Sequence, residues 1–170
     1  MLNLSGIVSD SIVDGPGIRT CIFSQGCPHH CDGCHNPETW DFGCGTDMEE
    51  ETLVEIVESN PLCRGVTFSG GEPFAQAAGF AKLAKLLKAK GYEVASYSGY
   101  TFEELLTGSP EQQELLGTID ILIDGPFLLS EKSLELVFRG SKNQRILDVP
   151  KSLAAGQAVE SASKRWFGEY

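Results

Sequence analysis

Three cysteines dominate the chemistry that this sequence offers. The run CPHHCDGCHNP gives Cys27, Cys31 and Cys34 the spacing C-x3-C-x2-C. A cubane iron–sulfur cluster with a protein ligand on every iron needs four thiolates. Three thiolates on one short loop hold three irons and leave the fourth open, and an open coordination position makes a metal site catalytic rather than structural. The spacing therefore predicts a [4Fe–4S] cluster whose fourth iron binds a substrate.

A second motif, SGGEP, occupies residues 69–73. Glycine has no Cβ, so Gly70 and Gly71 allow a bound molecule to approach the backbone closely. The alternative for the cysteine loop is a Cys3His zinc site, with one of the loop's three histidines as the fourth ligand. Zinc alone gives the SGGEP loop no role. The two motifs together therefore favour a cluster that works with a small-molecule cofactor.

Apolar runs that predict buried strands precede these loops, at residues 18–23, 65–69, 92–97, 119–124 and 134–139. Helical patterns lie between them, at residues 47–59 with Asp47 as N-cap, at residues 74–90, and after SGYT. Alternating strands and helices predict a parallel sheet, whose loops gather at the carboxyl edge. A complete barrel of this kind takes about 250 residues. The 170 residues therefore predict a single-domain α/β fold, an incomplete parallel (β/α) barrel of about five to six strands.

The composition excludes several classes of protein. A net charge of −11 argues against nucleic-acid binding, which depends on basic surfaces that neutralise phosphates. The first twenty residues contain neither a positively charged start nor a long apolar run, and no stretch approaches 18 apolar residues. We therefore expect a cytoplasmic protein with no membrane contact. In such a chain, six cysteines indicate metal or redox chemistry rather than disulfides.

The motifs also carry a family resemblance. CPHHCDGC after one strand and GGEP after the next resemble the radical S-adenosylmethionine superfamily, and residues 13–42 resemble its glycyl-radical activating enzymes. The stretches YSGYTFEEL, DILIDGPF and RGSKNQRILDV are similar to the branch that activates anaerobic ribonucleoside-triphosphate reductase. The resemblance covers residues 5–150 and implies a fold of the radical-SAM type. The pyruvate formate-lyase activase branch resembles the N-terminal third equally well, but its members are longer.

The resemblance implies an activity. Cys27, Cys31 and Cys34 would hold one [4Fe–4S] cluster, and S-adenosylmethionine would bind the open iron. Reductive cleavage of that cofactor would yield a 5′-deoxyadenosyl radical, which removes a hydrogen atom from a glycine of the partner. The implied partner is the glycyl-radical loop of the large subunit of anaerobic ribonucleoside-triphosphate reductase, with a flavodoxin as external electron donor. Activation of another glycyl-radical enzyme, and the non-catalytic zinc module, are the alternatives.

The resemblance also implies which residues form the site. The arginines and the asparagine after the last predicted strand suit the cofactor carboxylate, because a guanidinium fork matches that group. The DGPG turn is typical of glycyl-radical activases, and we expect it to receive the partner's glycine-bearing loop or to serve only as a turn. The residues expected at the cofactor are His35, Asn36, Ser69, Gly70, Gly71, Glu72, Pro73, Ser98, Asp124, Arg139, Asn143 and Arg145. The residues expected at the partner are Asp14, Gly15, Pro16 and Gly17.

Overall fold

A computed structural model describes residues 1–169 and contains one seven-stranded sheet, in the order β3-β1-β2-β4-β5-β6-β7. Strands β2, β4, β5 and β6 run parallel, whereas β1, β3 and β7 join antiparallel at the two sides. The predicted α/β fold with an incomplete, unclosed parallel barrel is confirmed, although four strands are parallel where about five to six were predicted. The strands are β1 (Leu2–Ser11), β2 (Arg19–Ser24), β3 (Thr46–Met48), β4 (Gly65–Gly70), β5 (Glu93–Tyr97), β6 (Ile121–Asp124) and β7 (Arg145–Asp148).

Helices connect the parallel strands, and among residues 1–169 none has the length and apolar character needed to cross a bilayer. Local sequence explains several of their starts. Ser109 forms a capping box with Gln112 at the start of α4, and the Thr101 hydroxyl accepts a hydrogen bond from the Glu104 N–H at the start of α3. The α-helices are α1 (Glu50–Glu58), α2 (Ala77–Ala89), α3 (Phe102–Leu106), α4 (Pro110–Leu116) and α5 (Val149–Ala155). The 3-10 helices are η1 (Pro37–Thr39), η2 (Pro73–Gln76), η3 (Leu129–Glu131) and η4 (Lys164–Phe167).

The two faces of the sheet have separate apolar cores. Successive side chains of a strand point to opposite faces, so Val94 and Leu122 join the large core under α1, α2 and α4, whereas Ala95 and Ile123 face the other way. On that second face, the fully buried Trp166 of η4 completes a smaller core. This second core is small, with five buried residues: Ala95, Ile121, Ile123, Ile146 and Trp166.

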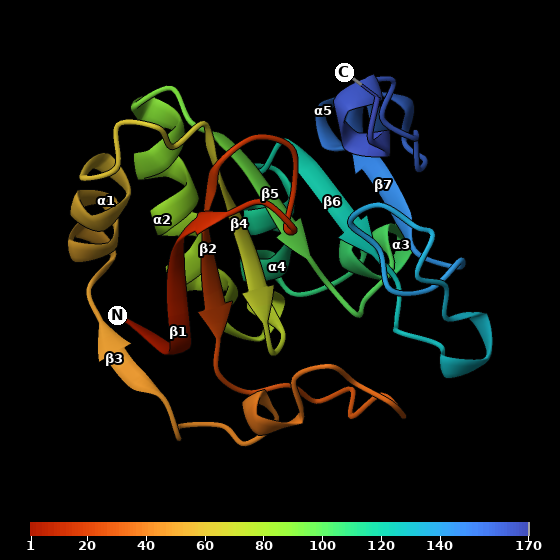
Figure 1. Cartoon of the computed structure of the whole chain (residues 1–170), viewed down its shortest axis with the longest axis horizontal. Coiled ribbons are helices and arrows are strands. Elements are labelled where there is room, and N and C mark those ends of the chain that lie inside the picture. The colour runs from red at the N-terminus through yellow and green to blue at the C-terminus, as the bar shows by residue number, and fades with distance from the viewer. Residues whose placement is uncertain (170) are drawn as a thin grey trace.

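The carboxyl ends of the parallel strands lie at one edge, as the sequence predicted. Ser24 at the end of β2 pairs with Gly70 at the end of β4, and β4 pairs in parallel with β5. In Figure 1 the arrowheads of β2 and β4 point toward the orange loop that carries the cysteines. The chain thus places the cysteine loop beside the loops that follow β4 and β5.

Two predicted elements are wrong. Residues 134–139 form turns and bends instead of a strand, and Leu134 is 90% exposed. The last strand is β7, which pairs antiparallel with β6 and so fills the sheet position that the apolar run was expected to take. Asp47 lies in β3, and the first helix begins at Glu50 with Glu49 as N-cap. Strands β1 and β3, which extend the sheet beyond β2, were not predicted.

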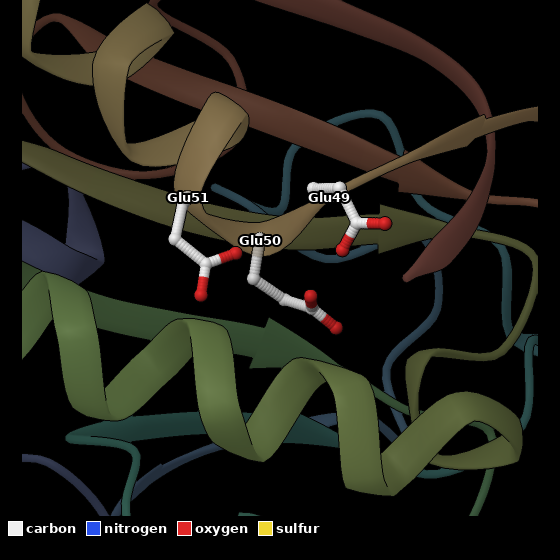
Figure 2. Close-up of side chains that lie close together, drawn as sticks. All are labelled: Glu49, Glu50 and Glu51. Carbon is white, nitrogen blue, oxygen red and sulfur yellow. The ribbon is translucent and has the colours of Figure 1, made fainter.

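An ionic cluster joins the start of α1 to the first strand and to α2. Within residues 1–169 the carboxylates of Glu49, Glu50 and Glu51 form the one group of three or more metal-ligand side chains within 4.8 Å of one another. Figure 2 shows Glu50 and Glu51 extending from α1 toward α2. The Met1 ammonium group lies 2.7 Å from Glu50 Oε1, and Lys82 Nζ lies 2.8 Å from Glu51 Oε1. Because the Met1 ammonium group and Lys82 already pair with these carboxylates, the cluster is an ion-pair network.

The cluster should make the stability of the fold depend on pH. Burial raises the pKa of Glu50, but hydrogen bonds from the Met1 ammonium group and the backbone, with the charge of Lys82, lower it overall. A carboxyl with a lowered pKa stabilises the fold above its unfolded pKa, about 4.3, and loses that effect as the pH falls through the folded value. We expect Glu50→Gln to lower the free energy of unfolding by about 1 kcal/mol at pH 7.

Urea unfolding of Glu50→Gln at pH 7 and at pH 3 measures this effect. The variant should change less between the two pH values than the wild type does. Glu49→Gln is the matched control, because the Glu49 side chain is 55% exposed and lies 4.0 Å from the Met1 nitrogen. Equal changes in the two variants would contradict a specific role for Glu50.

Candidate metal and cofactor site

A cavity of about 440 Å3 opens at the carboxyl edge of the sheet, within the size range of small-molecule sites. Residues that line it come from the loops after β2, β4, β5 and β6. A larger cavity of about 640 Å3 lies near the starts of β5 and β6 and contains none of the predicted site residues. The predicted residues that line the first cavity are Asp14, Cys27, Cys31, Cys34, His35, Asn36, Ser69, Gly70, Gly71, Ser98 and Arg139.

Backbone hydrogen bonds close the cysteine loop on itself. The Cys27 N–H donates to the Trp40 carbonyl at 3.1 Å, and the Cys34 N–H donates to the Cys31 carbonyl at 3.1 Å. The Asn36 N–H donates to Cys34 Sγ at 3.4 Å. His30 has a φ of +48°, which turns the chain between the first two cysteines. All three cysteines are half-buried and face one cavity.

The surroundings of Cys27 act on its thiol in opposite directions. Burial raises its pKa, the backbone N–H groups of His29 and His30 lower it through hydrogen bonds to the sulfur, and the charge of Glu72 raises it. The pKa is raised overall. Iron ligation requires the thiolate, so binding of a metal here would release a proton.

The three cysteines suit a polynuclear cluster. They line one cavity, and in such a cluster each sulfur binds a different metal atom.

The glycines of the SGGEP loop allow it to contact the cysteine loop through backbone atoms. A Cβ on Gly71 would lie 2.3 Å from the Gly26 carbonyl oxygen, and a Cβ on Gly70 would lie 2.6 Å from the Ser24 nitrogen. The Glu72 N–H donates to the Gly26 carbonyl at 2.8 Å. Glycine at these positions is therefore required by close approach of two loops.

Two hydrogen-bond donors of the residues that line the cavity fit an acceptor-rich group. Trp40 Nε1 and Arg139 Nε are both buried and have no hydrogen-bond partner among the described residues. Buried donors of this kind are normally satisfied. Arg139 also lines the cavity, where its guanidinium group suits the carboxylate of a cofactor. The residues present thus fit an iron–sulfur cluster with a carboxylate-bearing cofactor.

Glu72 and Pro73 are buried and do not line the cavity, and their predicted contact with a cofactor stays a prediction. Glu72 is 0% exposed, and its carboxylate accepts hydrogen bonds from His29, Phe74, Ser98 and Gly99. Pro73 is buried at the start of η2. The part of the SGGEP loop that reaches the cavity is Ser69, Gly70 and Gly71.

Asp124, Asn143 and Arg145 are also absent from the cavity lining among the described residues. Asp124 lies opposite Arg145 in the β6–β7 pair, and its Oδ1 accepts a hydrogen bond from Arg145 Nε at 3.0 Å. The Phe102 N–H donates to Asp124 Oδ2 at 2.7 Å. Hydrogen bonds to Asp124 and Glu103 raise the pKa of Arg145. Asn143 donates to the Pro126 carbonyl at 2.7 Å. These residues hold the loop after β6, and their contact with a cofactor stays a prediction.

The DGPG turn reaches the cavity through Asp14 and packs on buried side chains. Asp14 lines the cavity, and its carbonyl accepts a hydrogen bond from the Thr67 hydroxyl at 2.8 Å. Arg19 is 1% exposed and forms an ion pair with Glu93 at 2.9 Å. A Cβ on Gly15 would lie 2.7 Å from Arg19 Cδ and 2.9 Å from Trp166 Cη2. Gly15, Pro16 and Gly17 do not line the cavity.

The sequence analysis missed several residues that complete the cavity wall. Phe127, Leu136, Phe138 and Gln144 belong to the loop between β6 and β7, which was interpreted partly as a strand. The Tyr97 hydroxyl at the end of β5 donates to the Phe138 carbonyl at 2.7 Å and so fixes this loop. Tyr97 is the one position that the pattern could have indicated, because it ends a predicted strand at the carboxyl edge.

Known proteins resemble this chain closely. Residues 13–147 match the family described as a 4Fe-4S single cluster domain. Anaerobic ribonucleoside-triphosphate reductase-activating proteins are 34% identical in Vibrio cholerae, over 79% of this chain and 90% of the relative, and 32% identical in Escherichia coli K12, over 78% and 90%. That of Enterobacteria phage T4 is 33% identical over 85% and 93%. The crystal structure of QueE from Escherichia coli covers 59% of this chain and 50% of its own, with a TM-score of 0.41 and 22% identity, which is too slight to support an inference.

Proposed function

The chain belongs to the family of anaerobic ribonucleoside-triphosphate reductase-activating proteins, and from this premise we propose that it installs a glycyl radical on that reductase. It is a radical S-adenosylmethionine enzyme that uses a [4Fe–4S] cluster. The observation that carries the proposal is the meeting of three half-buried cysteines and the glycine backbone of residues 69–71 in one cavity. A cluster held by three cysteines keeps an iron free for a cofactor.

Each part of the cavity then has a task. Cys27, Cys31 and Cys34 would hold the cluster, which would supply the electron for reductive cleavage of S-adenosylmethionine. The backbone of Ser69, Gly70 and Gly71 binds the amino group of the cofactor, since glycine permits close approach. Arg139, which lines the cavity, would bind its carboxylate, because a guanidinium fork matches that group.

The remaining wall orients the cofactor and limits the entry of water. His35 stands edge-on to Phe127, with ring centroids 5.2 Å apart, and together with Asn36 forms the side of the cavity next to Cys34. Ser98 lines the side after β5. Phe127, Leu136 and Phe138 supply apolar surface, which protects a reactive radical from solvent.

The partner would dock at the mouth of the cavity, over the DGPG turn. Asp14 to Gly17 receive the glycine-bearing loop of the reductase large subunit in this proposal. Support comes from the neighbouring Ile12 and Val13, which are 70% and 72% exposed although both are apolar. A flavodoxin-like donor would supply the electron, and the reaction would take place in the cytoplasm.

The first experiment is anaerobic reconstitution with iron and sulfide, followed by reduction and addition of S-adenosylmethionine and the reductase. We expect 5′-deoxyadenosine, methionine and the electron paramagnetic resonance (EPR) doublet of a glycyl radical on the reductase. Exchanging the reductase for a pyruvate formate-lyase separates the two partners. Cofactor cleavage without a radical on the reductase, but with one on the lyase, would transfer the proposal to the other partner.

A charged residue at the proposed docking surface should weaken partner binding. Ile12→Asp places a carboxylate where an apolar side chain is to be covered, so the concentration of reductase that half-saturates radical formation should rise about tenfold. Titration of radical yield against reductase concentration measures it. Leu62→Asp is the matched control, since Leu62 is 59% exposed after α1 and does not line the cavity. An equal rise in both variants would place the interface elsewhere.

A further inference from the structure

The buried carboxylate of Glu72 joins three loops of the site. Its Oε1 accepts hydrogen bonds from His29 Nε2 at 2.6 Å and from the Gly99 N–H at 2.7 Å. The Ser98 hydroxyl lies 3.0 Å from Oε2, and the Phe74 N–H donates to Oε2 at 3.0 Å. The donors come from the cysteine loop, the loop after β5 and the SGGEP loop itself.

The partners of Glu72 determine which group donates in the histidine contact. Two backbone N–H groups donate to the Glu72 side chain, one to each oxygen, so both oxygens act as acceptors. His29 Nε2 therefore carries the proton and donates. A buried carboxylate with this many donors is strongly held, because charge-assisted hydrogen bonds are shorter and stronger than neutral ones.

The imidazole of His29 is also fixed by packing. A Cβ on Gly99 would lie 2.5 Å from His29 Cδ2 and 2.6 Å from Nε2, so glycine alone leaves room for the ring there. The Tyr100 ring meets it edge-on, with centroids 4.5 Å apart. The His29 side chain is only 17% exposed. Gly99 and Tyr100 together therefore restrict the His29 ring to one orientation.

We propose that Glu72 and His29 form a positioning pair that sets the cysteine loop against the two loops that bind the cofactor. The pair rests on the proposed function, since it serves the cluster and cofactor assigned to this cavity. His29 follows Cys27 by two residues, so a fixed His29 side chain also fixes the backbone next to this proposed cluster ligand. Glu72 acts through His29 and never touches the cofactor, which explains why it lies behind the cavity.

Capping of η2 accounts for only part of the hydrogen bonding of Glu72. Glu72 is the N-cap of η2, and the hydrogen bond from the Phe74 N–H satisfies that role. The hydrogen bonds from His29 and Gly99 connect segments 43 and 27 residues away in the sequence. An N-cap needs neither of them, whereas a pair that aligns separate loops needs both.

The test compares His29→Ala with His29→Gln, which keeps an N–H donor on a chain of similar reach. His30→Asn is the matched control in the same loop, since asparagine tolerates the positive φ of His30 and leaves the Glu72 contact intact. Each reconstituted protein is examined without the reductase. The measurements are iron content, the midpoint potential of the cluster, and the affinity for S-adenosylmethionine from the change in the EPR spectrum of the reduced cluster.

His29→Ala should retain its iron, because the three cysteines remain, and should bind S-adenosylmethionine about tenfold more weakly. The midpoint potential of its cluster should fall, since hydrogen bonds to cluster sulfurs raise that potential. For one electron, a fall of about 59 mV corresponds to a tenfold change in the reduction equilibrium. His29→Gln should recover most of both losses. His30→Asn should match the wild type.

Three results would overturn the pair. The first is wild-type affinity and potential in His29→Ala. The second is an equal loss in His30→Asn, which would indicate a general disturbance of the loop. The third is loss of iron from both His29→Ala and His29→Gln, which would make the imidazole an iron ligand. A different outcome concerns the wild type: its EPR spectrum stays the same when S-adenosylmethionine is added. That outcome would contradict the proposal that this cavity binds the cofactor, and with it the positioning pair.

Discussion

Serine at any one of Cys27, Cys31 and Cys34 is expected to abolish the cleavage of S-adenosylmethionine. Each cysteine lines the same cavity and is the sole protein ligand proposed for its iron. A serine hydroxyl is a hard, protonated ligand, whereas cluster iron is held by thiolates. Residues that only support a metal ligand cost about 10- to 100-fold when they are changed, so loss of a ligand itself should exceed 100-fold.

Iron content, visible absorption and the yield of 5′-deoxyadenosine, all measured anaerobically, test this expectation together. Cys44→Ser is the matched control, because Cys44 is an exposed free thiol outside the cavity lining. It should keep wild-type iron and activity. A serine variant of the motif that keeps both would show that its cysteine is no ligand. Zinc in place of iron after reconstitution of the wild type would contradict the cluster itself.

The cysteine loop was predictable because its chemistry is local. Three ligands within eight positions need no knowledge of distant strands, and a strand before them orients the loop toward the carboxyl edge. The same holds for Ser69 and Gly70, which end β4, and for Gly71, which follows it; all three reach the cavity as expected. Where a motif directly follows a parallel strand, its sequence position and its place in the fold coincide.

Residues after β6 were harder to predict because the last strand reverses direction. The apolar run at 134–139 resembles a parallel strand, but the chain turns back and β7 pairs antiparallel with β6. That register places Arg145 opposite Asp124, and the two side chains form an ion pair. Arg139, in the irregular loop, is the member of the predicted basic set that reaches the cavity. The three candidates, two arginines and an asparagine, were thus separated only by strand direction.

The role of Trp166 depends on contacts that no sequence pattern indicates. It lies beyond the last predicted strand, yet its ring is fully buried and covers the Arg19 guanidinium, with 5.1 Å from Arg19 Cζ to the ring centroid. Arg19 in turn donates to the Pro16 carbonyl at 3.4 Å. The C-terminal segment therefore supports the DGPG turn across more than a hundred residues of sequence, as a long-range tertiary contact.

Gly71→Ala is expected to weaken binding of S-adenosylmethionine by about tenfold or more while the cluster still assembles. The added Cβ would lie 2.3 Å from the Gly26 carbonyl oxygen and 3.0 Å from the Thr39 carbonyl oxygen. Both are backbone atoms beside the cysteine loop, so neither can rotate away as a side chain would. The two loops must separate, which typically costs about 1 to 3 kcal/mol, and 1.4 kcal/mol is already tenfold in affinity.

Two measurements distinguish a role of Gly71 in cofactor binding from a role in loop packing alone. They are the affinity of the reduced, reconstituted protein for S-adenosylmethionine and its free energy of unfolding. Gly6→Ala is the matched control, because a Cβ there meets nothing within 4 Å and the residue has no positive φ. If Gly71→Ala lowers stability but leaves the affinity unchanged, the glycine only permits the loops to pack. A lower affinity with wild-type iron content would mean that the distance between the SGGEP backbone and the cysteine loop determines how the cofactor is held. Because the cysteines remain in place in this variant, that result would separate cofactor binding from cluster assembly.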